Sequence, residues 1–486
     1  MPAPTTRPDV GGPGPSRPRW AFLLLAAVGG APAAAALEIL PSVTVGAVYT
    51  DNLFLTPDNE VDDFVGRIDP RLDITHQSPR INLRADYTYS YLRYTETEDS
   101  DASFSAGSAA LDLVLVQNLL TLESVGELSQ TLIDPEDGVF YTNVPIVDNR
   151  TDEARLETSP HLQTEIGGIG VDSRYVIGTV AYDAPDIQDV DYQETHTAIT
   201  GEERNKGLSW GLYHDYEVYE YETPPDNKSQ LAYLTLTYGL RQSGDFFVFG
   251  SVGKESDYED FTDASLEDTY WEVGFRRQTS RTLLEAAYGD RSFGSTVRAL
   301  LRREINQGSI ELSYREDPSV QESIFEQRPA DGGVPQPPDT PGNIDRPGIG
   351  DRFIYKLLSA SLVRAVGRNE VSLLLFNEER DQFVDRTDTD EDPVTDSETE
   401  TGVVLGLSRQ VGRRTTVGGS GQYSQREFRE GNEDEVSELR AFVLYELGQK
   451  LSLEGWLAHY EQQGSDNPND NYQEFQTGLS ANYRFR

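Results

Sequence analysis

The stretch FQTGLSANYRF, residues Phe475–Phe485, predicts the fold of this chain. Successive side chains of a β-strand point to opposite faces, so the odd-numbered residues share one face and the even-numbered residues share the other. The odd-numbered residues are apolar or aromatic apart from Thr477, and the even-numbered residues are polar or glycine. This alternation over about ten residues is typical of a strand that crosses a bilayer with one face toward lipid.

The same stretch resembles the C-terminal recognition strand of bacterial outer-membrane barrels. The residues that we assign to this assembly strand are Gly478, Leu479, Tyr483 and Phe485. The sequence departs from the pattern at its end, because Arg486 follows the last aromatic residue. An edge strand of a soluble β-sandwich would alternate in a similar way, so the rest of the chain has to separate the two interpretations.

The first 36 residues predict an export signal. Three arginines precede an apolar stretch at Ala21–Val28, and Ala34–Ala36 offers a small-residue cleavage site. The mature chain would then run from residue 37 to residue 486 as one barrel domain. No later apolar run approaches the ~18 residues of a membrane helix, so we expect any membrane span to consist of strands.

The composition excludes several classes of function. The formal net charge is −42, with 83 acidic against 41 basic residues, whereas binding to a nucleic acid backbone calls for clustered Lys and Arg. The chain has no cysteine, which excludes disulfides and thiol chemistry. We find no phosphate-binding loop, no dinucleotide-binding glycine motif and no Cys/His metal spacing, so no cofactor is expected.

The lengths of the connections predict a barrel. From Ser42 onward the sequence divides into 22 alternating segments, joined in turn by tight turns of two to four residues and by longer polar loops. A sandwich has no reason to separate short from long connections in this way, whereas a membrane barrel has short periplasmic turns and long extracellular loops. The sequence therefore predicts an all-β, transmembrane antiparallel β-barrel of about 22 strands, an even number within about 18–24, in a Gram-negative-type outer membrane.

Charged residues at alternate strand positions predict a polar lumen. The candidate lumen-lining residues are Arg84, Asp86, Glu272, Arg276, Arg298, Arg302, Glu311 and Arg315. A charge that faces lipid near mid-bilayer costs about 2–4 kcal/mol, so we expect these side chains to face the interior. Two interpretations stay open: a charged channel wall for a polar or anionic solute, and ion pairs that fill a polar interior. Most tyrosines, among them Tyr87 and Tyr238, fall on the outer face, which favours an interfacial aromatic girdle over sugar-stacking platforms.

Two loops carry further candidates. Asp388, Asp390 and Asp392 alternate as carboxylate ligands of a hard cation would, but Pro393 stands where a calcium loop needs glycine, which favours solvated surface charge and no metal. The Pro-rich segment 317–351 predicts irregular structure, either folded into the lumen as a constriction or extended outside.

A nucleophile motif is present without its context. Residues Gly207–Gly211 read G-x-S-x-G around Ser209, but that motif needs a strand–turn–helix, and here it opens a strand. We therefore expect no enzyme. The first strand also begins within about five residues of the predicted cleavage site, which leaves no room for the plug domain of an energised transporter of this size.

Short motifs resemble those of the outer-membrane barrels associated with PEP-CTERM/exosortase exopolysaccharide loci. The residues that carry this resemblance are Pro41–Val45, Tyr49–Leu53, Asp69-Pro70 and Tyr288–Thr296. The resemblance implies a role in the secretion or surface display of extracellular polysaccharide, and it carries no catalytic residues.

These observations lead to a working hypothesis with two alternatives. We expect an outer-membrane β-barrel pore or secretion component of exopolysaccharide export. The first alternative is a closed structural or adhesive barrel whose acidic loops bind cations or glycans, and the second is a barrel-embedded hydrolase that uses Ser209. The expected partners are outer-membrane lipid, the barrel-assembly machinery, and a polysaccharide or its export proteins, with no nucleic acid.

Overall fold

The computed structural model consists of β-strands joined by turns and loops. It describes residues 37–97, 100–133, 140–184, 187–203, 207–221, 226–240, 245–259, 266–319, 353–382, 397–428, 431–464 and 471–485. The predicted signal peptide, the metal candidates Asp388, Asp390 and Asp392, and most of the Pro-rich segment lie outside the described residues.

The strands alternate in direction along the chain. Their bounds are β1 (Glu38–Thr50), β2 (Asp63–Gln77), β3 (Ile81–Tyr94), β4 (Ala102–Val116), β5 (Leu120–Leu132), β6 (Arg150–Ile166), β7 (Ile169–Tyr182), β8 (Val190–Glu203), β9 (Leu208–Tyr221), β10 (Asn227–Gly239), β11 (Phe246–Glu259), β12 (Leu266–Gln278), β13 (Thr282–Arg291), β14 (Gly294–Ile305), β15 (Gly308–Ser319), β16 (Phe353–Val366), β17 (Asn369–Gln382), β18 (Ser397–Gln410), β19 (Thr415–Glu427), β20 (Glu433–Glu446), β21 (Leu451–Gln463) and β22 (Tyr472–Arg484).

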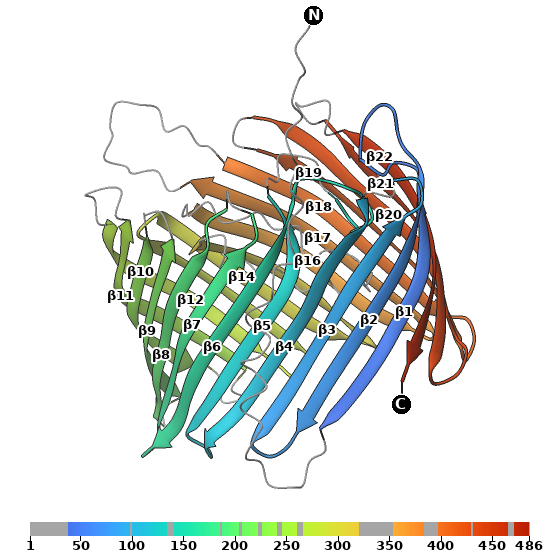
Figure 1. Cartoon of the computed structure of the whole chain (residues 1–486). Helices are drawn as coiled ribbons and strands as arrows, with labels where there is room; N and C mark the ends of the chain where they lie inside the picture. The colour runs from blue at the N-terminus through green and yellow to red at the C-terminus, as the bar shows by residue number, and fades with distance from the viewer. Residues whose placement is uncertain are drawn as a thin grey trace, which may run out of the picture.

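These strands form one closed antiparallel sheet (Figure 1). Each strand pairs with its neighbour in sequence, and the sheet closes where β1 pairs with β22, from Ser42 opposite Arg484 to Thr50 opposite Gln476. Closure leaves no free sheet edge, so the backbone groups of every strand find partners within the barrel. The predicted antiparallel barrel and its 22 strands are confirmed.

The barrel has two unlike ends. We call the end with the short connections, such as 167–168, 306–307 and 367–368, the turn rim, and the opposite end the loop rim. Gly167 and Gly168 both have positive φ, as the type I′ turn of a two-residue hairpin requires. β1 begins and β22 ends at the turn rim, which lies toward the bottom of Figure 1.

The boundary predicted for the Pro-rich loop is wrong by three residues. Asp317, Pro318 and Ser319 belong to β15, where Pro318 lies opposite Ile354 of β16. The ladder between β15 and β14 has already ended at Tyr314, so the missing N–H of Pro318 removes no sheet hydrogen bond. A proline therefore ends a strand only where a neighbouring strand would accept a hydrogen bond from the N–H that proline lacks.

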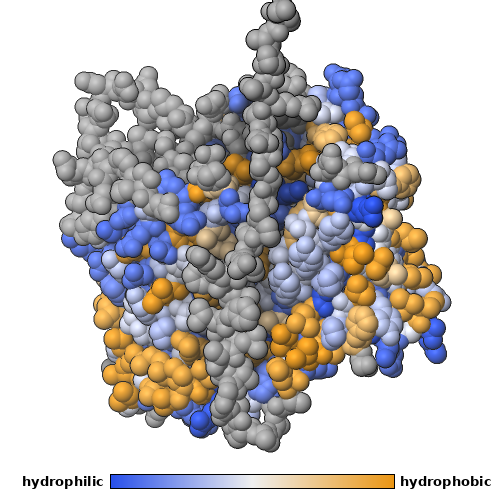
Figure 2. Space-filling view, viewed as in Figure 1, coloured by the Kyte–Doolittle hydropathy of each residue, from blue (hydrophilic) through white to orange (hydrophobic). Residues whose placement is uncertain are grey.

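One face of the sheet is apolar and exposed. Val273, Leu312 and Leu479 lie on it with 54%, 45% and 68% of their surface exposed. In Figure 2 such apolar side chains gather in the lower part of the wall, toward the turn rim. Tyr87 and Tyr238 are exposed on the same face, where the sequence placed them. We call this the outward face and the opposite face the lumen face.

Candidate functional site

A segment of the loop rim folds into the barrel. Residues 140–149, here the inward segment, lie in the connection between β5 and β6, directly before β6, and pack against the lumen face of β21 and β22. Tyr141 is 4% exposed and stacks on Tyr460, with ring centroids 5.2 Å apart. Gln476 Nε2 donates to Thr142 Oγ1 at 2.9 Å, and the Tyr94 hydroxyl donates to the carbonyl of Val144 at 2.9 Å. Burial raises the pKa of Tyr141 far above its usual value, so this ring stays neutral.

The inward segment completes an apolar cluster inside the lumen. The cluster is made by Val48, Leu53, Leu55, Val65, Leu92, Tyr94, Phe104, Leu132, Phe140, Tyr141, Val144, Val436, Trp456, Ala458, Tyr460 and Tyr472. Most of these residues come from β1–β5 and β20–β22, so the cluster covers the lumen face of this part of the barrel. The sequence signal for it is the apolar run FYTNVPIV, residues 140–147, in what is otherwise a polar loop.

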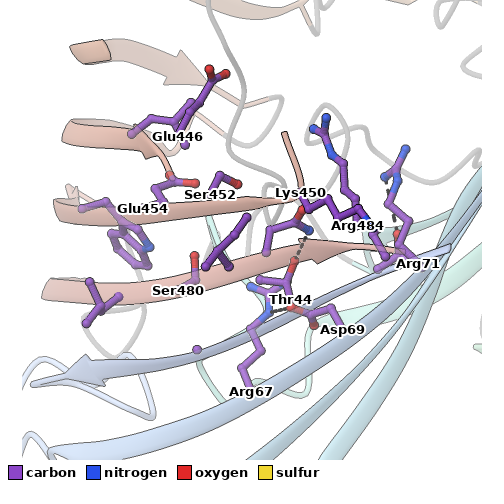
Figure 3. Close-up of a pocket in the computed structure, with 18 of the residues that line it drawn as sticks. Thr44, Arg67, Asp69, Arg71, Glu446, Lys450, Ser452, Glu454, Ser480 and Arg484 are labelled. Carbon is purple, nitrogen blue, oxygen red and sulfur yellow. Dashed lines mark hydrogen bonds and ion pairs between the residues drawn. The ribbon is translucent and has the colours of Figure 1, made fainter. Parts of the chain in front are cut away.

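A chamber lies at the turn rim beside this cluster. It has a volume of about 670 Å³ and is lined by β1, β2 and β20–β22 (Figure 3). Its basic lining residues are Arg67, Arg71, Arg440, Lys450 and Arg484, and its acidic lining residues are Asp69, Asp73, Glu446 and Glu454. Five basic against four acidic side chains is the reverse of the balance in the whole chain, where 83 acidic residues outnumber 41 basic residues. Asp86, which pairs with Arg71, adds a fifth acidic group beside the chamber, so positive and negative charges balance there in a protein that is strongly acidic as a whole.

Ion pairs hold the wall of the chamber. Arg67 Nε lies 2.5 Å from Asp69, and Arg71 lies 3.0 Å from Asp73 and 3.2 Å from Asp86. Arg440 pairs with Glu454 at 3.2 Å and lies over the Trp456 ring. In the described part of the chain, Lys450 and Arg484 take part in no ion pair, and Figure 3 places both at the chamber.

Five of the eight predicted lumen residues meet on one wall, formed by β12–β15. Register puts all five on the lumen face. Arg298 lies 2.9 Å from Glu272 across two strands and also pairs with Glu285, while Arg276 lies 3.8 Å from Glu285. Arg302 Nε pairs with Glu311 at 2.5 Å. The sequence interpretation missed Glu285, the carboxylate that links Arg298 to Arg276.

Of the other three predicted lumen residues, Arg84 and Asp86 lie on β3, while Arg315 lies on the β12–β15 wall itself, four residues from Glu311 along β15. Asp86 of β3 accepts from Ser108 at 2.6 Å and pairs with Arg71, so it belongs to the chamber side. Arg84 lies two residues along the same face of β3. Arg315 of β15 lies with its guanidinium 5.8 Å from the centroid of the Tyr355 ring.

Further charged groups that the sequence analysis did not single out line the lumen. Arg291 binds Glu255 at 2.6 Å and Asp317 at 3.1 Å. His161 bridges Glu123 and Asp172, at 3.3 Å and 2.9 Å. His196 bridges Glu194 and Asp215 in the same manner. These groups are recognisable only after the register is known, because their partners lie on neighbouring strands.

Neither a histidine directly opposite Ser209 nor a cluster of metal-ligating side chains is found within the described residues. Ser209 lies on β9 opposite Thr237 of β10 and Glu202 of β8, and neither of these cross-strand partners is a histidine. No group of three or more His, Asp or Glu side chains within the described ranges is arranged to hold a metal ion. Across the same ranges, no helix has the length and apolarity needed to cross a membrane.

Comparison with known proteins finds similar structures only. The sequence matches no protein-family model and no curated protein. The chain is similar in structure to the FrpB iron transporter from Neisseria meningitidis, with TM-scores of 0.55 for the F3-3 variant and 0.56 for the apoprotein form of the F5-1 variant. In each case the identity is 8%, over 92% of this chain and 81% of that chain.

A second similar structure is a mutant of the ferric enterobactin receptor PfeA from Pseudomonas aeruginosa. The TM-score is 0.50 and the identity 8%, over 92% of this chain and 80% of that chain. At this identity the likeness concerns the fold. The chain therefore has the closed antiparallel β-barrel fold of these transporters and receptors.

Proposed function

We propose that this chain is an outer-membrane pore for polar solutes that serves the export of an extracellular polysaccharide. A closed sheet is the only strand arrangement that satisfies the backbone within a bilayer, and an apolar outward face suits contact with lipid. The described strands have this arrangement, with Leu312 and Leu479 outside and Arg298 paired to Glu272 inside.

The observation on which the proposed pore rests is that two sides of the lumen differ in chemistry. The apolar cluster and the inward segment cover the side next to β20–β22, whereas the β12–β15 wall presents ion-paired charges to the lumen. A polar solute would follow this second wall, because carboxylates and guanidinium groups there can replace part of its hydration. The chamber would act at the turn rim, where Lys450 and Arg484, which form no ion pair among the described residues, would contact an anionic solute as it enters.

Two observations support transport as the role and a polysaccharide as the cargo. The similar structures are an iron transporter and a ferric enterobactin receptor, which supports transport as the general role. The resemblance of Pro41–Val45 and Tyr288–Thr296 to barrels of exopolysaccharide loci supports a polysaccharide as the cargo.

Single-channel recording tests the pore. Purified mature protein in a planar bilayer should give stepwise currents, and an anionic polysaccharide added on the turn-rim side should reduce them. Silence over a wide range of salt and voltage would contradict the pore. Currents that the polysaccharide leaves unchanged would contradict the cargo alone.

A closed structural or adhesive barrel is the second candidate. The inward segment favours it, because buried contacts such as the Tyr141–Tyr460 stack hold this segment against one side of the lumen. This candidate predicts no current in the same recording, together with calcium-dependent surface binding that is lost when Asp388–Asp392 is deleted.

A further inference from the structure

We propose that one sector of the turn rim binds the headgroup phosphates of anionic phospholipids. The binding surface, here the arginine crescent, consists of Arg277, Arg281, Arg303, Arg364, Arg368, Arg409, Arg413 and Arg414, from β12 to the start of β19. All eight side chains are exposed. The proposal rests on the outer-membrane location proposed above and goes beyond the pore function, because it concerns the outside of the barrel.

Neighbouring arginines differ in whether they have a partner. Arg276 and Arg302 face the lumen and pair with Glu285 and Glu311. The next residues, Arg277 and Arg303, face outward, and neither forms an ion pair with any residue that the structure describes. The other members of the crescent also form no ion pair within the described ranges. In a chain with twice as many acidic as basic residues, eight arginines without an acidic partner point to an anion from outside the chain.

The acidic side chains of this sector all lie on the other face. Along the turn-rim ends of the described strands β12–β19, the acidic residues are Glu285, Glu304, Glu311 and Glu370. Register places each of them on the lumen face. The outward face of the same strand ends carries positive charge only, so an anion held there meets no repelling carboxylate on that face.

Four of the arginines form a row at one height. The row has one arginine on every second strand: Arg277, Arg303, Arg364 and Arg409. A line drawn straight across the sheet from one of these arginines meets the strand of the next arginine two residues short of it. The next arginine therefore lies two residues nearer the turn rim. This shift of one residue per strand inclines the row by about 35° to the line that runs straight across the strands, given a rise of ~3.3 Å per residue and a strand spacing of ~4.8 Å. Figure 1 shows the strands tilted across the barrel. Barrel strands tilt by about 35–45°, so a row with this inclination runs around the barrel at nearly constant height.

That height is the edge of the apolar band. Each arginine of the row lies two residues beyond an apolar outward residue, as Arg303 lies beyond Leu301 and Arg409 beyond Leu407, which is 53% exposed. Two residues span about 7 Å along a strand, or about 5 Å in height at this tilt, which is comparable with the thickness of the headgroup layer on one side of a bilayer. Arg281, Arg368 and the other turn arginines lie beyond the row, where they reach the water-facing side of the headgroups.

The crescent occupies one sector of the barrel. At the turn-rim ends of β6, β7 and β10, the outward residues are apolar, including Ile166, Ile169 and Leu240, which are 70%, 41% and 52% exposed. A general attraction to the membrane surface would not need such asymmetry. Arginine, with no lysine among the eight, suits bidentate contact with phosphate oxygens. The geometry therefore fits a local anionic phospholipid site.

Lipid competition followed by native mass spectrometry tests the site. Mature protein in neutral detergent is offered equal amounts of phosphatidylglycerol and phosphatidylcholine, and the retained lipids are counted. The wild type should retain phosphatidylglycerol preferentially. R303Q/R364Q should lose phosphatidylglycerol by about fivefold for each arginine removed, with phosphatidylcholine unchanged. Heat-modifiable gel migration verifies that the variant barrel is folded.

The matched control removes the same charge elsewhere. R80Q/R93Q changes two exposed arginines on the opposite wall, outside the row, and should keep the wild-type preference. An unchanged preference in R303Q/R364Q, or an equal loss in the control, overturns the site. If poly-glutamate binding falls in R303Q/R364Q while phosphatidylglycerol does not, the crescent docks an acidic protein and the lipid proposal is wrong. A chain that stays monodisperse without detergent instead refutes the outer-membrane location.

Discussion

Arg291 shows how this barrel tolerates charge away from bulk water. Its guanidinium binds Glu255, a residue that is 2% exposed, and reaches Asp317 on β15. Removing one member of such a buried pair leaves the other charge unpaired, which costs about 3–5 kcal/mol. An exposed pair is worth only about 0–1 kcal/mol, because water screens it. Burial therefore decides how much each of the lumen pairs contributes.

We expect Arg291→Gln to destabilise the folded barrel by about 3–5 kcal/mol. The matched change Arg302→Gln, at a pair whose arginine side chain is 53% exposed, should cost at most about 1 kcal/mol. Urea unfolding of both variants in detergent, followed by tryptophan fluorescence, measures the difference. Equal losses of unfolding free energy in the two variants would show that burial of an ion pair does not determine its contribution to stability here.

At the scale of the strand, glycines provide room for aromatic rings. Six glycines lie directly opposite an aromatic residue whose ring covers the glycine: Gly178 with Tyr192, Gly201 with Trp210, Gly274 with Phe249, Gly402 with Phe376, Gly418 with Phe442, and Gly478 with Trp456. At Gly478 an added Cβ would lie 2.5 Å from the Trp456 ring. The predicted assembly residue Gly478 thus has a packing reason to be glycine.

Gly478→Ala should therefore displace Trp456 and lower the stability by about 1–3 kcal/mol, the usual cost of overpacking. Because Trp456 lines the chamber and lies under Arg440, its emission should also shift. Fluorescence of a variant that keeps Trp456 as its single tryptophan measures both effects. Ser480→Ala, two residues along the same face, is the control and should change neither.

The inward segment is the element with the largest effect on the lumen. It reaches β21 and β22 through Tyr141 and Thr142, and it turns an open loop into part of the lumen wall. Its position depends on contacts with strands more than 300 residues away in sequence, as between Thr142 and Gln476. Such contacts leave no local periodicity in the sequence.

Tyr141→Ala should loosen the inward segment and raise the single-channel conductance of the proposed pore. Tyr445→Ala, which removes an exposed tyrosine from the outward face of β20, should leave the conductance unchanged. Planar bilayer recording of both variants gives the comparison. A conductance that Tyr141→Ala does not change would mean that the solute path avoids the inward segment entirely.

At the scale of the whole molecule, the two rims carry opposite charge. The turn rim holds the arginine crescent together with Lys450 and Arg484, while the loop rim is acidic, as at Asp62, Asp63, Asp183 and Asp189. Charges fixed on opposite rims create a field along the barrel axis, and salt screens this field over ~10 Å at 0.1 M but over ~3 Å at 1 M.

The proposed pore should therefore rectify at low salt. Current of one polarity should exceed the other near 0.1 M salt, and the asymmetry should disappear near 1 M, where the screening length is about threefold shorter. Current–voltage curves recorded at both salt concentrations measure this effect. Asymmetry that persists unchanged at high salt would point to the shape of the lumen rather than to its charge.

The sequence by itself determined the class of fold. Alternation with a period of two assigned side chains such as Leu479 and Arg298 to opposite faces, and the separation of short from long connections predicted a barrel with an even number of strands. Both signals are local, since each is contained in one strand or one turn. They therefore appear in a single sequence without any knowledge of strand partners.

Only the tertiary structure decided which groups meet. Register brought Glu285 between Arg276 and Arg298, closure brought Gln476 to Thr142, and strand tilt brought Arg303 to the same height as Arg364. These relations join distant segments through the stagger of neighbouring strands. A pattern with a period of two excludes a slip of one residue, which would turn the apolar side chains to the lumen face, but a slip of two residues leaves it unchanged. The pattern that predicted the strands therefore does not fix which residues lie opposite each other.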